Sequence, residues 1–466
     1  MAGRYKAYPK YMTADSKWLD AIPAHWKVTA LKHVLSTPIT DGPHSTPIFQ
    51  DEGIPFVSAE AVSGGYINFD KIRGYISEED DTLFSQKYRP QLHDVYMIKS
   101  GATTGISAIV ETNRRFNIWS PLAVMRCKKS YNPYFLLNYL RSDSFQKSVQ
   151  LSWTFGTQQN IGMNTLENLT VCFPPFEEQQ KIANFLDHET AKIDTLIAKQ
   201  EKLIELLKEK RQAVISHAVT KGLNPDAPMK DSGVEWLGEV PEHWVVCCLK
   251  HIKGEDKGSF VDGPFGSNLK SEHFVDNGDV YVIESNFATT GLLDTTKLKT
   301  ISTEHFETIS RSETTEGAII IAKIGARYGM NSVMPALDKK AVVSGNSLSL
   351  KINDKAMDVQ YCHHLLTHLK QEGAMDDGVN VTAQPALSLG QLNNLPFLRP
   401  SKEEQQAIVN FVQQQEKSLS SLILNAEKMI ELSRERKTAL ISAAVTGKID
   451  VRHFVVEQGQ PQGAQG

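Results

Sequence analysis

The sequence predicts a mixed α/β protein in which two globular domains are separated by two long antiparallel helices that form a coiled coil. The same strings occur twice in the same order along the 466 residues, which indicates an internal pseudo-twofold duplication. Each half also ends in a long segment that lacks glycine and proline. Each copy far exceeds the roughly 20–50 residues of a solenoid repeat, so a whole domain with its connector is duplicated.

Three stretches carry the duplication. A Pro-x-His-Trp string and an Asp-Gly-Pro string recur, and the last part of each half matches without a gap. The paired stretches are 23–26 with 241–244, 41–43 with 262–264, and 166–220 with 392–446. Trp26 and Trp244 have apolar neighbours in both copies, so we expect core positions for them.

The two glycine-free segments, 176–221 and 401–446, are rich in Leu, Glu, Lys, Gln and Ala, which favour helices. Ser401 with Glu404 fits a capping box, and Gly222 and Gly447 supply helix stops. Apolar residues at steps of three and four predict one broad stripe on each helix, and we expect the two stripes to bury one another. The stripes comprise Ile182, Leu186, Ile193, Leu196, Ile197, Leu203, Ile204, Leu207 and Val214, and Ile408, Val412, Leu419, Leu422, Ile423, Met429, Ile430 and Leu440.

The globular parts mix short strands with helices. Strands are expected at 95–98, 106–110, 318–322 and 332–334, and helices at 135–140 and 361–369. The expected organisation is a first domain at 1–173, a long helix at 174–220, a linker at 221–234, a second domain at 235–399, a long helix at 400–447 and a disordered tail at 448–466.

Composition restricts the class of protein. No apolar run is long enough to span a membrane and no secretory signal is seen, so we expect a cytoplasmic protein. The five cysteines lack the paired spacing of zinc sites, and no metal site is expected. A formal net charge of −4 means that any nucleic-acid contact must come from local basic patches or from a partner.

Motifs for the chemistry of DNA modification are missing. Phe173–Phe176 and 132–135 resemble, but do not match, the Asp/Asn-Pro-Pro-Tyr/Phe loop of adenine methyltransferases. The segment 101–105 lacks the spacing and the lysine of a phosphate-binding loop. We therefore expect no catalytic residue and no cofactor in this chain.

The order and duplication of these strings resemble the specificity subunits of type I restriction-modification systems. The resemblance rests on 174–183, 399–408, 236–244 and 263–267, and it covers nearly the whole chain. It implies two target-recognition domains that each read one half of a bipartite, asymmetric double-stranded DNA target, with the helices fixing their spacing. Ala21 and Ala24 replace acidic residues of the second copy, which suggests that the two halves read different bases.

The resemblance also implies partners. Two methyltransferase subunits would supply S-adenosylmethionine, and restriction subunits would supply ATP hydrolysis with Mg²⁺ and cleavage. Two alternatives stay open: a specificity subunit of a type IIB-like restriction system, and a coiled-coil scaffold without a DNA role, which the acidic net charge motivates.

Candidate DNA contacts fall into two groups. Lysines and arginines near backbone-exposing glycines are expected at phosphates, and polar residues where the halves differ are expected at bases. The phosphate candidates are Lys99, Lys323, Arg327, Lys270, Lys71 and Arg73. The base-reading candidates are His44, Ser45, Thr46, Ser267, Asn268 and Gln158.

Overall fold

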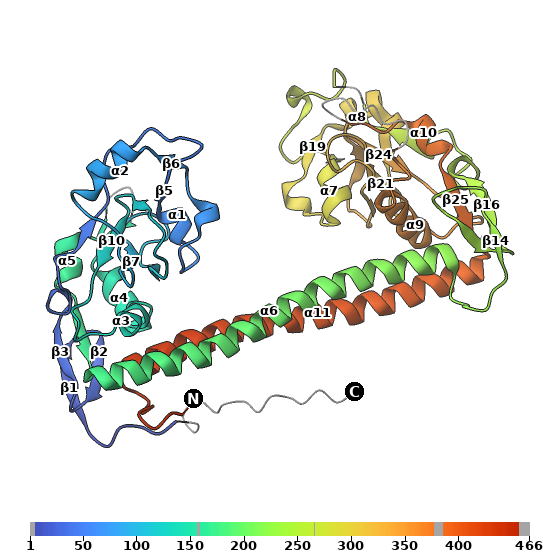
Figure 1. Cartoon of the computed structure of the whole chain (residues 1–466). Coiled ribbons are helices and arrows are strands. Elements are labelled where there is room, and N and C mark those ends of the chain that lie inside the picture. The colour runs from blue at the N-terminus through green and yellow to red at the C-terminus, as the bar shows by residue number, and fades with distance from the viewer. Residues whose placement is uncertain (1–4, 156–158, 265, 377–384, 456–466) are drawn as a thin grey trace. The chain divides into compact units, whose positions relative to one another are not determined.

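The computed structural model describes residues 5–155, 159–264, 266–376 and 385–455. The chain forms two compact units: unit 1 comprises Met1–Lys202 and Ala426–Gly466, and unit 2 comprises Leu203–Asn425. Each unit mixes strands with helices and contains part of both long helices (Figure 1). The predicted mixed α/β class is confirmed.

Unit 1 is built on a four-stranded antiparallel sheet in the order β4-β10-β7-β8. A three-stranded sheet in the order β6-β5-β9 contains one parallel pair, β5 with β9. Three antiparallel pairs, β1 with β2, β3 with β13 and β11 with β12, complete the unit. The strands are β1 (Tyr11–Ser16), β2 (Leu19–Pro23), β3 (Lys27–Ala30), β4 (Thr40–Asp41), β5 (Ile54–Val57), β6 (Tyr75–Ile76), β7 (Val95–Ile98), β8 (Ser107–Ile109), β9 (Asn117–Ile118), β10 (Leu122–Met125), β11 (Thr154–Phe155), β12 (Gln159–Asn160) and β13 (Thr170–Phe173).

Unit 2 repeats most of these pairings with different residues. Its main sheet has the order β17-β24-β21-β22, and its second sheet, β19-β18-β23-β20, again contains one parallel pair, β18 with β23. The pairs β14 with β15 and β16 with β25 correspond to β1 with β2 and β3 with β13. The strands are β14 (Met229–Asp231), β15 (Glu239–Pro241), β16 (Val245–Cys248), β17 (Phe260–Asp262), β18 (Val280–Ile283), β19 (Lys299–Ile301), β20 (Glu313–Thr314), β21 (Ile319–Ala322), β22 (Asn331–Val333), β23 (Lys340–Val343), β24 (Ser347–Leu350) and β25 (Pro396–Arg399).

The central strands β7 and β21 are apolar at every position because both faces of the sheet are covered. In β7, Val95 and Met97 belong to one core cluster, whereas Tyr96 and Ile98 belong to another. The residues of β21 divide in the same way between two clusters of unit 2. Each main sheet therefore separates two cores, and the predicted strands at 95–98 and 318–322 are confirmed within one residue.

Short helices cover the sheets. The helices of unit 1 are α1 (Ala59–Val62), α2 (Glu78–Ser85), α3 (Pro133–Leu140), α4 (Asp143–Leu151) and α5 (Met163–Glu167). Those of unit 2 are α7 (Ser285–Thr290), α8 (Thr303–Ile309), α9 (Val359–Gln371) and α10 (Leu389–Asn393). Both α3 and α9 begin after a side chain that accepts backbone N–H groups, Asn132 and Asp358 respectively, as expected of helix N-caps.

The two long helices are α6 (Phe176–Lys221) and α11 (Lys402–Val445). Gly222 and Gly447 follow them with φ of 79° and 72°, so the predicted stops are confirmed. Ser401 accepts the backbone N–H of Glu404 at 3.2 Å. The Glu404 side chain, however, bonds to His243.

The apolar stripes on α6 and α11 are buried only in part. Ile182 and Leu186 lie in the core of unit 1 together with Leu440, and Ile408 and Val412 lie in the core of unit 2. The expectation that the whole stripes are buried was wrong for several positions. These side chains lie on parts of the helices that the cores of the two units do not cover. The exposed members include Leu196, Leu203, Leu422 and Met429.

The Glu-Glu-Gln-Gln strings at the start of α6 and α11 attach each helix to its unit. In unit 1, Glu178 accepts hydrogen bonds from Tyr8 Oη at 2.7 Å and Trp26 Nε1 at 3.0 Å, and it lies 2.8 Å from His25 Nε2. In unit 2, Glu404 Oε2 lies 2.9 Å from His243 Nε2. The repeated Pro-x-His-Trp string therefore has a structural role, and Trp26 and Trp244 are buried as predicted.

The first glutamine of each string holds the start of a second helix. Gln179 Oε1 accepts the N–H of Asn132 at 2.8 Å, and Gln405 Oε1 accepts the N–H of Asp358 at 2.6 Å. Asn132 and Asp358 are the N-caps of α3 and α9. The adjacent glutamate and glutamine of each string thus attach the long helix at two places. The glutamate bonds to the Pro-x-His-Trp string, and the glutamine bonds to the N-cap residue of a short helix.

Two segments differ from their expected form. The segment expected to be a linker, 221–234, contains β14, which pairs with β15. Of the expected tail, 448–455 is described and packs on unit 1: Ile449 and Val451 are buried, and the N–H of Asp450 donates to Lys6 O at 2.7 Å. The remaining residues, 456–466, lie outside the described part of the chain. No helix in the described part has the length and apolar character needed to cross a membrane.

Candidate nucleic-acid interface

A buried carboxylate at the end of β4 gathers basic side chains in unit 1. Asp41 is fully buried and forms ion pairs with Lys87 and with Lys99, the latter at 3.2 Å, and its Oδ2 lies 3.2 Å from His44 Nε2. Lys87 lies just after α2, and Lys99 follows β7. We name Asp41, His44, Lys87 and Lys99 the Asp41 cluster.

Unit 2 has a matching arrangement at the end of β17. Asp262 forms ion pairs with Arg311 and with Lys323, the latter at 3.1 Å. Arg311 lies just after α8, in the 3₁₀ turn Ser310–Ser312, and Lys323 follows β21. Asp262, Arg311 and Lys323 form the Asp262 cluster, in which each residue comes from the element that corresponds to its counterpart in unit 1.

The cations keep both carboxylates charged. Burial raises the pKa of Asp41, but hydrogen bonds from Lys87 and Lys99 outweigh this and hold the pKa below its ordinary value. The pKa of Asp262 is likewise lowered, since Lys323 and Arg311 outweigh the effect of burial. Each carboxylate is therefore a fixed negative centre at neutral pH.

The glycine after each aspartate allows a close approach of two backbones. A Cβ on Gly42 would lie 2.1 Å from Ile118 O, and a Cβ on Gly263 would lie 1.9 Å from Ser344 O. Any side chain would collide with the backbone of the last residue of β9 in unit 1, or of the residue that follows β23 in unit 2. The Asp-Gly-Pro string thus places the loop after the carboxylate against the second sheet.

A third segment joins the same place. In unit 1, Gly101 N donates to Gln159 O at 2.9 Å and Ile161 N donates to Lys99 O at 2.9 Å, which fixes the β11–β12 hairpin beside Lys99. In unit 2, Gly325 N donates to Pro385 O and Leu387 N donates to Lys323 O. Three segments therefore meet in each unit: the Asp-Gly-Pro loop, the Lys-x-Gly turn (99–101 or 323–325) and the segment that bonds to this turn.

The structure brings several predicted contacts together. His44 and Lys99 are joined through Asp41, and Ser45 and Thr46 are exposed in the following loop. The guanidinium of Arg73 lies 5.0 Å from the Trp119 ring, next to the backbone that contacts Gly42, whereas Lys71 is exposed in a 3₁₀ turn. Gln158 lies outside the described residues.

The predicted contacts of unit 2 lie on two segments. Ser267, Asn268 and Lys270 are in the loop after Asp262, and Asn268 O lies 2.9 Å from His305 Nε2 of α8. Arg327 is exposed in the turn between β21 and β22. Lys323 is mostly buried against Asp262.

Lys87 and Arg311 are basic members of the clusters that the sequence analysis did not select. Neither lies beside a glycine, the feature on which the phosphate candidates were chosen. The repetition of Asp41 and Asp262 in the Asp-Gly-Pro strings was the available signal, because a buried aspartate needs a cation partner.

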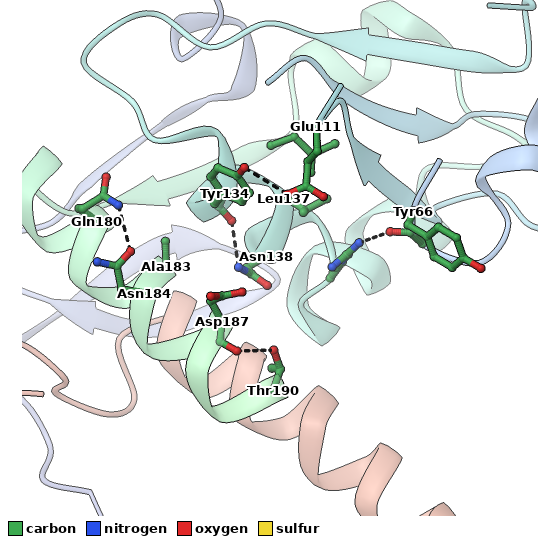
Figure 2. Close-up of a pocket in the computed structure, with 13 residues that line it drawn as sticks. Tyr66, Glu111, Tyr134, Leu137, Asn138, Gln180, Ala183, Asn184, Asp187 and Thr190 are labelled. Carbon is green, nitrogen blue, oxygen red and sulfur yellow. Dashed lines mark hydrogen bonds between the residues drawn. The ribbon is translucent and has the colours of Figure 1, made fainter. Parts of the chain in front are cut away.

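A polar pocket lies elsewhere in unit 1, between α3 and the start of α6 (Figure 2). Tyr134 donates to Glu111 at 3.2 Å, and Arg141 donates to Ser107 O at 3.0 Å. Burial lowers the pKa of Arg141. None of the predicted DNA contacts is among the thirteen residues drawn in Figure 2, and these residues do not pair a nucleophile with a base. Within the described part of the chain, no three His, Cys, Asp or Glu side chains are grouped to hold a metal ion.

The chain thus has two α/β units, and in each unit loops meet around an aspartate that is paired with two cations. The family model of the type I restriction modification DNA specificity domain matches residues 23–206 and 265–432, so the chain belongs to this family. The match includes part of both long helices.

Named relatives agree with this family. The chain is 26% identical over 450 residues to the MjaX type I restriction enzyme specificity subunit of Methanocaldococcus jannaschii, covering 93% of this chain and 96% of that protein. It is 25% identical over 326 residues to the MjaVIII specificity subunit of the same organism, covering 69% and 71%.

Two solved structures share the fold. A chain from a structure of the type I R-M system superposes with a TM-score of 0.68 at 15% identity, covering 92% of this chain and 99% of that chain. The HsdS subunit from Thermoanaerobacter tengcongensis superposes with a TM-score of 0.53 at 16% identity, covering 92% and 98%.

Proposed function

We propose that this chain is the DNA specificity subunit of a type I restriction-modification complex, and that each unit reads one half of a bipartite, asymmetric target. The observation that carries this proposal is the convergence, in both units, of three loops on an Asp–Lys ion pair within a family of DNA specificity domains. Two similar surfaces with different exposed side chains suit two different half-sites.

The long helices are proposed to be an antiparallel coiled coil that fixes the spacing of the half-sites. Within unit 1, Lys437 pairs with Asp194 at 2.6 Å and Arg434 pairs with Glu201 at 3.3 Å. Residue numbers therefore increase in opposite directions along the two helices, as in an antiparallel pair. Surfaces on one side of a duplex would read half-sites about 10 bp apart, one helical turn. The repeated pairings of the two units support an internal pseudo-twofold duplication.

The proposed domain organisation follows from this arrangement. Residues 1–173 and 235–399 are the two target-recognition domains, and 174–220 and 400–447 are the long helices. The intervening 221–234 connects the halves, and 448–466 follows the second helix.

We assign no catalytic centre to the chain. Two methyltransferase subunits would bring S-adenosylmethionine, and restriction subunits would bring ATP hydrolysis with Mg²⁺ and cleavage. At the DNA, His44, Ser45, Thr46, Gln158, Ser267 and Asn268 are proposed to read bases, because polar side chains on exposed loops can bond to base edges. Lys71, Arg73, Lys270 and Arg327 are proposed near phosphates.

The test is to co-express the chain with the methyltransferase encoded beside it and to map methylated adenines by single-molecule sequencing. We expect one bipartite asymmetric motif that disappears when this gene is deleted. An unchanged methylome in a host where the complex demonstrably assembles would refute the proposal.

A further inference from the structure

In each cluster the aspartate pairs with one lysine that is nearly buried and with one lysine or arginine that reaches solvent. In the Asp41 cluster, the Lys99 side chain is 13% exposed and that of Lys87 is 46% exposed. In the Asp262 cluster, Lys323 is 19% exposed and Arg311 is 69% exposed. The two units share this division although the exposed cation is a lysine in one and an arginine in the other.

The exposed cations keep unused hydrogen-bond donors. The Lys87 ammonium has three N–H donors and bonds to Asp41 and to Gly42 O, the latter at 3.2 Å. The guanidinium of Arg311 has five donors, and within the described part of the chain only its Nη2 is bonded, to Asp262. Both side chains are thus held at one end and can donate outward.

The nearly buried lysines join two loops instead. Lys99 Nζ pairs with Asp41, while its carbonyl accepts the N–H of Ile161 and its N–H donates to Pro121 O. Lys323 is held in the same way, by Asp262, by Leu387 N and by Asn346 O. Because little of either side chain is exposed, Lys99 and Lys323 present much less surface to a phosphate than Lys87 and Arg311 do.

We propose that Lys87 and Arg311 contact DNA phosphates, one for each half-site, and that Asp41 and Asp262 are positioning residues that aim them. Lys99 and Lys323 then fasten the Lys-x-Gly turn to the Asp-Gly-Pro loop rather than touching DNA. This inference rests on the proposed function, and it reassigns the phosphate contact within each cluster.

The carboxylate has a second consequence for binding. Each aspartate offsets one of two neighbouring positive charges. The cluster therefore still attracts phosphate, but it binds DNA of unrelated sequence less strongly than two unpaired cations would. Its fixed position also sets where the phosphate lies relative to the base-reading loops, since phosphate contacts determine the register of a protein on the duplex. Loss of the carboxylate should therefore affect discrimination more than affinity.

The experiment measures the salt dependence of DNA binding by the full chain assembled with its methyltransferase. The probes are a duplex that carries the motif mapped by methylation and a duplex of unrelated sequence. Lys87→Gln and Arg311→Gln are each expected to reduce the slope of log K against log [salt] by about 0.9, the value for one phosphate. Lys87→Arg and Arg311→Lys should restore the slope.

Matched controls lose a positive charge outside the clusters. Lys147 on α4 and the exposed Lys355 serve this purpose in units 1 and 2. Lys147→Gln and Lys355→Gln are expected to leave the slope unchanged. The same result is expected for Lys99→Gln and Lys323→Gln, whatever they do to stability.

The aspartates give a readout that a purely structural role would not produce. Asp41→Asn and Asp262→Asn should keep or increase affinity for the unrelated duplex while lowering discrimination by about tenfold. A slope that falls for Lys99→Gln but not for Lys87→Gln would overturn the inference. A wild-type complex that binds both duplexes equally would refute the proposed function instead, and the slopes on the unrelated duplex would still decide which lysine meets phosphate.

Discussion

The glutamate that attaches each long helix has more partners in unit 1 than in unit 2. Glu178 accepts from Tyr8 and Trp26 and lies beside His25, and its side chain is 8% exposed. Glu404 is 25% exposed and bonds to His243. Trp244 Nε1 has no hydrogen-bond partner within the described part of the chain. The same motif therefore anchors the two helices with different strength.

Part of the difference comes from what precedes each Pro-x-His-Trp string, because the preceding segment of unit 1 supplies Tyr8 to Glu178. In unit 2 the chain runs directly from α6 into β14. In unit 1 the corresponding place is filled by two separate segments, 5–10 and 449–454, which are joined by the bond from Asp450 to Lys6 and by Arg452 over the Tyr8 ring. Unit 1 thus relies on additional hydrogen bonds where unit 2 has a covalent connection.

The largest expected effect breaks this comparison directly. Glu178→Ala should destabilise unit 1 by about 4 kcal/mol, because it leaves two buried donors, Tyr8 Oη and Trp26 Nε1, without an acceptor. Glu404→Ala should cost unit 2 only about 1 kcal/mol. Hydrogen exchange read by mass spectrometry separates the two units. Equal losses of protection in both units would mean that the extra partners of Glu178 contribute nothing.

The next largest effect should be a difference between the two units in their loss of stability at acidic pH. Burial lowers the pKa of His364 on α9 to about 4, whereas the corresponding residue of unit 1, counted from the N-caps, is Asn138. The folded-state pKa lies below the ordinary value of 6.5, so stability is complete above pH 6.5 and is lost as the pH falls towards 4.

The loss should be on the order of 3 kcal/mol and confined to unit 2. Hydrogen exchange at pH 7 and pH 4.5, corrected for the intrinsic exchange rate, checks this expectation. His364→Asn serves as the control, because it should remove the part of the acid sensitivity that His364 contributes. His363 and His368 on the same helix, whose pKa values burial also lowers, should retain the remainder. Unit 1 opening first on acidification would contradict the prediction.

Replacing the glycine of each Asp-Gly-Pro loop should affect the two units equally, in contrast to the two preceding predictions. Gly42→Ala and Gly263→Ala should each cost about 2 kcal/mol, because the added methyl overlaps backbone atoms. Methylome sequencing should then report weakened discrimination in one half of the motif for each variant. Gly233→Ala is a matched control for added bulk, since a Cβ there meets nothing within 4 Å, although its positive φ adds some strain.

The smallest effect concerns a single base. Asn268→Ala should relax discrimination at one position of one half-site by about 1 kcal/mol, since an asparagine amide can pair with adenine. Thr46→Ala should act on the other half-site. Competition binding with singly substituted duplexes measures both, and a change in the same half-site for both variants would show that the units do not read separately.

Local signals in the sequence were sufficient for part of this structure. The continuous apolar run at 95–98 is β7, and the Gly222 and Gly447 stops end α6 and α11, because apolar runs and left-handed glycines act over a few residues. The burial of Leu196 and Leu203 was mispredicted, since periodicity defines a face of a helix but not how far a core extends along it.

The duplication, the long helices and the strings that form the Asp41 and Asp262 clusters were determined by the sequence alone. Which cation of each cluster faces solvent was decided only by the tertiary structure. Strand pairing of β4 and β7 with β10 brings Asp41 and Lys99 together, and Lys87 reaches Asp41 from the segment after α2. An ion pair between residues this far apart in the chain produces no periodic pattern in the sequence, because it depends on where the folded sheets place the ends of their strands.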